Sequence, residues 1–194
     1  GSSNLPRDGG VMDIRWHGRG GQGIVTAAKL LAEVSIYGGK HAQALPDYGA
    51  ERMGAPIRAY TRISDKPIRA YCQITSPDIV VVVDPTLIDA IPVDEGLKKE
   101  GIILVNTNLS PGELKERTGW NARVHTVDAT SIALSCMGRN FPNIPLLGAF
   151  VKITGVVKLE EIEKKLREKF GGRVRLEEME GNVRALRRGY EEVR

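Results

Sequence analysis

Hydrophobic and polar positions follow two different periods along the chain, which predicts a mixture of strands and helices. Two runs, DIVVVVD at 78–84 and GIILVNT at 101–107, are almost wholly apolar and rich in β-branched residues. Such runs are typical of central parallel strands that are buried on both faces. Less regular runs predict further strands at 12–18, 40–45 and 123–130.

Helical periodicity accounts for most of the chain between and after these strands. We predict helices at 24–39, 131–138, 144–155, 159–172 and 177–193, and a short helix-like segment at 92–100. In the two C-terminal helices the apolar residues recur every three or four positions, which gives each helix one apolar face. That face packs either on its own domain or against a partner subunit. The alternation predicts an α/β fold: an open, mostly parallel, Rossmann-like sheet flanked by helices, with a β-hairpin and C-terminal helices.

The hairpin is predicted from two similar runs, IRAYTRIS at 57–64 and PIRAYCQI at 67–74, which read as a β-hairpin or a pair of adjacent strands. The residues before them, 46–56, have no consistent period and predict a long loop. Long loops in compact domains often carry function.

A single domain is expected over residues 12–194. Residues 1–11 contain no apolar stretch of the kind a signal peptide needs, and we interpret them as a disordered leader or tag remnant, with Met12 as the native start.

Charge and cysteine content exclude several classes of protein. Lys and Arg exceed Asp and Glu by 28 to 24, a small excess for a nucleic-acid-binding protein. The two cysteines, Cys72 and Cys136, form no metal-binding motif, so this chain is expected to hold no iron–sulfur cluster or structural zinc. Sparse cysteine fits a reducing cytoplasm. No apolar run approaches the ~20 residues that span a membrane.

The strongest chemical signal is HGRGGQG at 17–23, which lies between a predicted strand and a predicted helix. Gly18, Gly20 and Gly23 satisfy the pattern G-x-G-x-x-G. Glycines let an anion approach the backbone amides, and the N-terminus of the following helix attracts negative charge. Arg19 adds a charge-assisted hydrogen-bond donor. The segment therefore predicts an anion-binding loop.

The identity of the anion is open at this level. A dinucleotide site wants an acidic residue at the end of the second strand, whereas Asp47 and Glu51 come later, inside the loop. A triphosphate loop would need a Gly-Lys-Ser/Thr sequence, which is missing. Alternatively, the glycines serve only a tight turn and a close contact between helix and sheet.

Little in the sequence indicates a self-contained catalyst. His17, His41 and His125 stand singly, and we interpret them as structural or solvated. Asp84 and Asp128 end their strands, where they either face a ligand or cap the following segment. No nucleophile elbow or zinc-protease motif is present, so the chain is expected to bind rather than to catalyse alone.

The chain resembles the gamma subunit of the 2-oxoacid:ferredoxin oxidoreductases. The stretches that carry the resemblance are IRWHGRGGQGIVTAAKLLAEV, QALPDYGAERMGAPIRAYTRIS, PDIVVVVDPTLI and IPLLGAFVKITG. PNIPLLGAFVKITG and the tail RALRRGYEEV look most like the pyruvate-specific branch, that is, pyruvate synthase.

The resemblance implies a role in a complex that converts a 2-oxoacid, coenzyme A and oxidised ferredoxin to an acyl-CoA, carbon dioxide and reduced ferredoxin. It implies alpha, beta and delta partner subunits, which hold thiamine diphosphate, Mg²⁺ and [4Fe-4S] clusters. It gives this chain a structural role and a share in binding coenzyme A, without catalytic residues or metal ligands. The chain alone is then expected to be inactive.

The implied coenzyme A contacts are Gly18, Arg19, Gly20, Gly21, Gln22 and Gly23 in the glycine loop, and Tyr48, Glu51 and Arg52 in the following loop. Met53 departs from the resemblance, since a polar residue is expected there. Glu51 and Arg52 have an alternative role as an ion pair within their loop. The alternative function is a stand-alone Rossmann-like nucleotide-binding protein or dehydrogenase; a nucleic-acid-binding module or a membrane protein is not favoured.

Overall fold

The computed structural model describes residues 10–47, 54–69 and 74–194. Its elements are β1 (Val11–Arg19), α1 (Ile24–Tyr37), β2 (His41–Asp47), β3 (Pro56–Ser64), β4 (Ile79–Val82), the 3₁₀ helix η1 (Pro85–Asp89), β5 (Ile102–Asn106), α2 (Pro111–Thr118), β6 (Arg123–Val127), α3 (Ala129–Met137), α4 (Asn143–Thr154), α5 (Leu159–Phe170) and α6 (Leu176–Glu192). Val11, which the sequence assigned to the leader, is already the first residue of β1 and pairs with Ser64.

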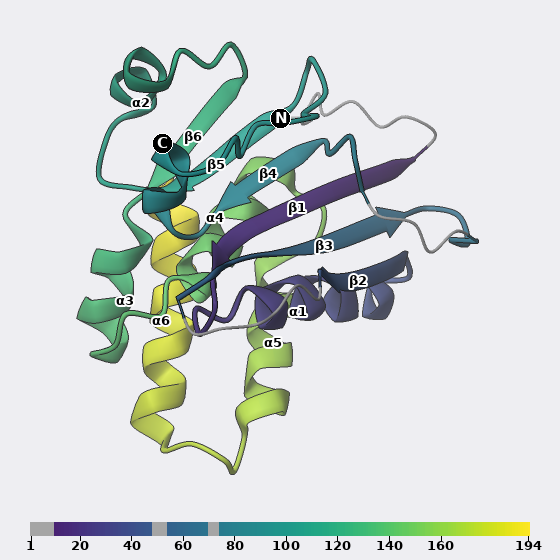
Figure 1. The fold of residues 1–194 in the computed structure, drawn as a ribbon. Helices are drawn as coiled ribbons and strands as arrows, with labels where there is room; N and C mark the ends of the chain where they lie inside the picture. Colours follow the sequence, from purple (N-terminus) through teal and green to yellow (C-terminus); the bar gives the residue numbers. More distant parts are fainter. Residues whose placement is uncertain (1–9, 48–53, 70–73) are drawn as a thin grey trace.

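The strands form one sheet in the order β2-β3-β1-β4-β5-β6 (Figure 1). β1, β4, β5 and β6 are parallel neighbours, and β3 runs antiparallel between β1 and β2. The predicted α/β fold with a mostly parallel sheet is confirmed. β1, α1 and β2 form a βαβ unit whose two strands are separated by β3.

The antiparallel hairpin is built from other strands than those expected. Residues 57–64 do form a strand, β3. Its hairpin partner is β2, the strand that precedes it in the sequence, and the two pair antiparallel. Both edges of β3 are paired, with β1 and β2, so a strand at 67–74 has no edge of β3 to join. Residues 67–69 form no strand, and residues 70–73 lie outside the described part of the chain.

The prediction of a helix-like segment at 92–100 is wrong. Turns occupy these residues, and the short helix lies earlier, in η1. Gly96 has a φ of +75°, and a Cβ there would overlap the backbone oxygen of Thr75. The chain therefore turns at Gly96 against a neighbouring segment, which a continuous helix would prevent.

Alternate residues of the strands face two separate apolar layers. Ile14, Trp16 and Val81 pack on the larger layer with α1, α3, α4, α5 and α6. Val80 and Val82 face the smaller layer, which includes Leu87 of η1, Leu114 of α2 and Val93. Figure 1 shows α2 on the opposite side of the sheet from α1, α4, α5 and α6. In the described chain no helix combines the length and apolar character needed to cross a bilayer.

Candidate functional site

The glycine loop lies where the sequence places it, between the carboxyl end of β1 and the N-terminus of α1. Gly23 is the N-cap of α1, with a φ of +73°, and no side chain caps this end of the helix. β1 lies between β3 and β4. The next two strands of the chain, β2 and β3, lie on one side of β1, whereas β4, β5 and β6 lie on its other side, so the strand order reverses at β1. In open α/β sheets ligands bind in the crevice at such a reversal of strand order.

Packing requires two of the glycines, whatever the loop binds. A Cβ on Gly18 would lie 2.5 Å from Cγ2 of Ile24, and one on Gly23 would lie 2.8 Å from Nδ2 of Asn143. Gly20 pairs with the next loop, since its N–H donates to the carbonyl of Ala55 at 3.0 Å. The alternative that these glycines serve a close contact of helix and sheet is therefore part of the structure, and it is compatible with anion binding.

The side chain of Gln22 links the glycine loop to the end of β4. Its Oε1 accepts a hydrogen bond from the backbone N–H of Arg19 at 2.7 Å, and its Nε2 donates to Oδ2 of Asp84 at 2.7 Å. Arg19 donates to Oγ1 of Thr86 and, at 3.1 Å, to the carbonyl of Gly54, and its Nε lies 3.4 Å from Asp84. Arg19, Gln22 and Asp84 are thus brought together.

Asp84 is ionised in this network. Burial acts to raise the pKa of its carboxyl, but hydrogen bonds from Thr86 and Gln22, with the charge of Arg19, outweigh burial and lower that pKa below its usual value. The negative charge of Asp84 fixes Arg19 beside the loop. It also repels any anion that approaches Asp84 directly.

Asp84 and Asp128 both cap the segments that follow them. Asp84 accepts a hydrogen bond from the N–H of Thr86 at 3.0 Å, and Asp128 accepts one from the N–H of Ser131 at 3.1 Å. At the same edge, Asn106 donates to the carbonyl of Val83 at 3.0 Å, a tie between β4 and β5 that our sequence analysis missed. Its only signal was a polar residue closing an apolar strand.

The three predicted residues of the second loop, Tyr48, Glu51 and Arg52, lie outside the described residues. Gly54 and Ala55, which follow them, are hydrogen-bonded to Gly20. Within the described ranges no cluster of three His, Cys, Asp or Glu side chains could hold a metal ion.

A second polar group missed by the sequence analysis lies on the other face of β1. Arg15 and His17, which are 4% and 2% exposed, point away from the α1 layer, and Nε of Arg15 donates to Nε2 of His17 at 2.9 Å. Burial first, then the positive charges of Arg15 and Arg58, lower the pKa of His17 from 6.5 to about 3. His17 is therefore neutral at physiological pH.

This neutral histidine makes the stability of the fold depend on pH. Between pH 6.5 and about 3 the unfolded chain binds a proton at His17 that the folded chain does not. The free energy of unfolding therefore falls with decreasing pH, by up to about 1.4 kcal/mol per pH unit from this group. We expect His17→Gln to remove this slope in urea unfolding between about pH 6 and pH 4. The exposed His41→Gln is the matched control, and equal slopes in both variants would contradict the assignment.

Comparison with known proteins gives one consistent family. The model of the family "Pyruvate ferredoxin/flavodoxin oxidoreductase" matches residues 13–192. The chain is 50% identical to "Pyruvate synthase subunit PorC" of Thermotoga maritima over 94% of each chain. It is 48% identical to "Pyruvate/ketoisovalerate oxidoreductases common subunit gamma" of Pyrococcus furiosus, over 94% of this chain and 97% of that relative.

A solved structure has the same fold. The crystal structure of the pyruvate oxidoreductase subunit PORC of Thermotoga maritima superposes with a TM-score of 0.84 at 47% identity, and the match covers 95% of this chain and 97% of that one. These matches confirm the resemblance found in the sequence. The chain belongs to the pyruvate ferredoxin/flavodoxin oxidoreductase family, in which it corresponds to the gamma subunit.

Proposed function

We propose that this gamma subunit helps to bind coenzyme A and to assemble a thiamine-dependent complex that converts pyruvate, coenzyme A and oxidised ferredoxin to acetyl-CoA, carbon dioxide and reduced ferredoxin. Alpha, beta and delta subunits complete the complex, and they hold thiamine diphosphate, Mg²⁺ and the [4Fe-4S] clusters. Ferredoxin binds to the assembled complex rather than to this chain by itself. The complex is cytoplasmic. The names of the relatives support pyruvate as the 2-oxoacid.

The observation that carries the coenzyme A role is the position of the glycine loop at the uncapped N-terminus of α1, with Arg19 beside it. The side chain of Arg19 is 29% exposed, and most of its hydrogen bonds go to neutral acceptors, Thr86 and Gly54. A phosphate oxygen that replaces a neutral acceptor makes a stronger, charge-assisted hydrogen bond. Binding energy at this distant end of coenzyme A then positions its thiol for acyl transfer, an entropic contribution to the rate.

We expect Arg19→Ala to raise the KM for coenzyme A in the assembled complex by about 10-fold or more, the usual loss for a hydrogen bond to a charged group. The KM for pyruvate should stay unchanged, because the substitution does not touch the thiamine site. Steady-state ferredoxin reduction measures both values. The control is Arg187→Ala, which removes an arginine of α6 that pairs with Glu163. Equal KM values for coenzyme A in the two variants would contradict a role of Arg19 in binding coenzyme A.

Assembly is tested separately, by purification from the native source. The proposal expects this chain to elute with brown iron–sulfur partners, and it expects the separated chain to reduce no ferredoxin. A colourless chain that elutes alone would contradict the assembly role.

A further inference from the structure

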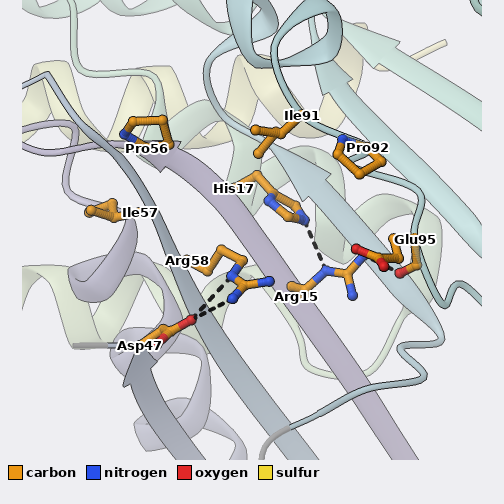
Figure 2. A pocket seen from close by; sticks show the side chains of 9 residues that line it. All are labelled: Arg15, His17, Asp47, Pro56, Ile57, Arg58, Ile91, Pro92 and Glu95. Atoms are coloured by element: carbon orange, nitrogen blue, oxygen red, sulfur yellow. Dashed lines mark hydrogen bonds and ion pairs between the residues drawn. The ribbon is translucent and has the colours of Figure 1, made fainter. Parts of the chain in front are cut away.

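A pocket of about 420 Å³ lies over β1 and β3, on the face of the sheet that α1 does not cover (Figure 2). Strand register builds its floor, because His17 of β1 lies opposite Arg58 of β3, which lies opposite Asp47 of β2. The segment after η1 supplies the facing wall, which includes Ile91 and Pro92. None of the glycine-loop residues proposed to contact coenzyme A lines this pocket.

The floor contains a hydrogen-bond donor without an acceptor. Nε2 of His17 accepts the hydrogen bond from Arg15, so the proton of the neutral ring is on Nδ1. Nδ1 is buried and has no partner among the described residues. In Figure 2 the ring nitrogen that is not bonded to Arg15 faces the side of the pocket where Arg58 lies. A buried N–H without an acceptor is costly, so this one points to a missing acceptor.

Two guanidinium groups line the same pocket, that of Arg15 on the Nε2 side of the ring and that of Arg58 on the other side. Arg15 is held by the carbonyl oxygens of Val93, at 3.0 Å, and Glu95, and the described residues place no carboxylate at ion-pair distance from it. Arg58 directs Nε and Nη2 to a single oxygen of Asp47, at 3.1 and 2.9 Å. Its side chain is 43% exposed, so this ion pair is weak and can exchange partners.

These groups select an anion of low charge with an apolar body. Apart from Asp47, the polar groups of the floor, Nδ1 of His17 and the guanidinium of Arg58, are donors, which calls for an acceptor. The carboxylates of Asp47 and the exposed Glu95 also line the pocket, and they repel a phosphate dianion more than a monoanion. Pro56, Ile57, Ile91 and Pro92 form aliphatic walls that suit a short hydrocarbon chain.

We propose that this pocket binds a small aliphatic carboxylate, whose oxygens accept the Nδ1–H of His17 on the side of the ring where the guanidinium of Arg58 lies, while the charge of Arg15 attracts the anion from across the ring. The aliphatic part of the ligand lies against the proline and isoleucine walls. The lining residues named here all come from this chain, so we expect an organic acid to bind the gamma subunit itself.

The test follows the ring nitrogens of His17 by NMR in the full chain labelled with ¹⁵N-histidine, with His17→Gln to assign its signals. The probes are sodium isobutyrate and its neutral isostere isobutyramide. We expect isobutyrate to shift the His17 signals saturably, with at least about 10-fold weaker binding of the amide, because the amide lacks the charge that the guanidinium groups attract. Arg58→Gln should weaken isobutyrate binding about 5-fold or more, whereas the matched Arg117→Gln on exposed α2 should leave it unchanged.

Three results would overturn the proposal: His17 signals that do not move up to about 50 mM isobutyrate, equal binding of acid and amide, or equal binding by the Arg58 and Arg117 variants. Since none of these readouts involves coenzyme A, failure here leaves the Arg19 experiment unaffected, and failure there leaves this one intact.

Discussion

Gly189→Ala is expected to lower the free energy of unfolding by about 2–3 kcal/mol, even though alanine is the better helix former. α4 and α6 make the most extensive contact between helices in the described chain. They cross at two glycines, Gly148 and Gly189. A Cβ on Gly189 would overlap the carbonyl oxygen of Pro145 and lie 2.6 Å from its carbonyl carbon. Backbone atoms cannot rotate aside, so α6 must move away from α4 and open the larger apolar layer.

Gly112→Ala is the matched control for this prediction. Gly112 lies in α2 with open space where its Cβ would be, so the same substitution is expected to stabilise the chain by a few tenths of a kcal/mol. Urea unfolding followed by circular dichroism measures both variants. If Gly189→Ala proved neutral or stabilising, the close crossing of α4 and α6 would be wrong.

The crossing of these helices shows how far the sequence could predict the C-terminal layer. The regular apolar positions of 177–193 predicted the helix and its buried face, and that face packs on α3 and α4 of the same chain. The alternative of a docking face arose because periodicity shows that a face is apolar but not what covers it. The fit between Gly148 and Gly189 depends on residues some 40 positions apart and leaves no local signal.

For the strands, too, the sequence predicted the elements but not how they pair. Unbroken β-branched runs predicted β4 and β5, because only a strand buried on both faces needs such residues. The alternation in 57–64 predicted a strand but not its partners. Pairing depends on which edges are free, and β3 is inserted between β1 and β2.

Helix α2 went unpredicted because Leu114 is its only buried residue, too few for periodicity to be seen. Its ends did carry a signal. Ser110 accepts a hydrogen bond from the N–H of Glu113, and Gly119 closes the helix with a φ of +75°. Capping residues would have found this helix.

For the candidate site, the sequence predicted where the loop lies but not what surrounds it. Asp84 was expected at a strand end, yet its bond to Gln22 depends on β4 being the neighbour of β1. The pair of Arg15 and His17 escaped for a similar reason. Alternation puts both on one face of β1, but only the assembled sheet shows that α1 covers the other face and leaves a pocket here.

The opposite face of the same strand carries the last prediction. Trp16→Ala is expected to lower the free energy of unfolding by about 3–5 kcal/mol, the usual range for a large aromatic residue in a core. Trp16 is fully buried, and its ring centre lies 6.0 Å from that of Phe150. Its Nε1 donates to Oγ1 of Thr61 at 3.0 Å, and that hydroxyl in turn donates to the carbonyl of Ala28. Trp16 thus joins β1, β3, α1 and α4.

Two further variants separate the volume of the ring from its hydrogen bond. Trp16→Phe keeps most of the apolar contact and should lose about 1–2 kcal/mol, since Oγ1 of Thr61 still has its bond to Ala28. Trp120→Ala removes a tryptophan that is only partly buried against the smaller layer, and it should cost about half as much as Trp16→Ala. Circular dichroism is the suitable probe, because each substitution removes a fluorophore. Equal losses of unfolding free energy for Trp16→Ala and Trp120→Ala would contradict the assignment of the main core to the face of the sheet that α1 covers. They would also contradict the placement of His17 on the opposite face.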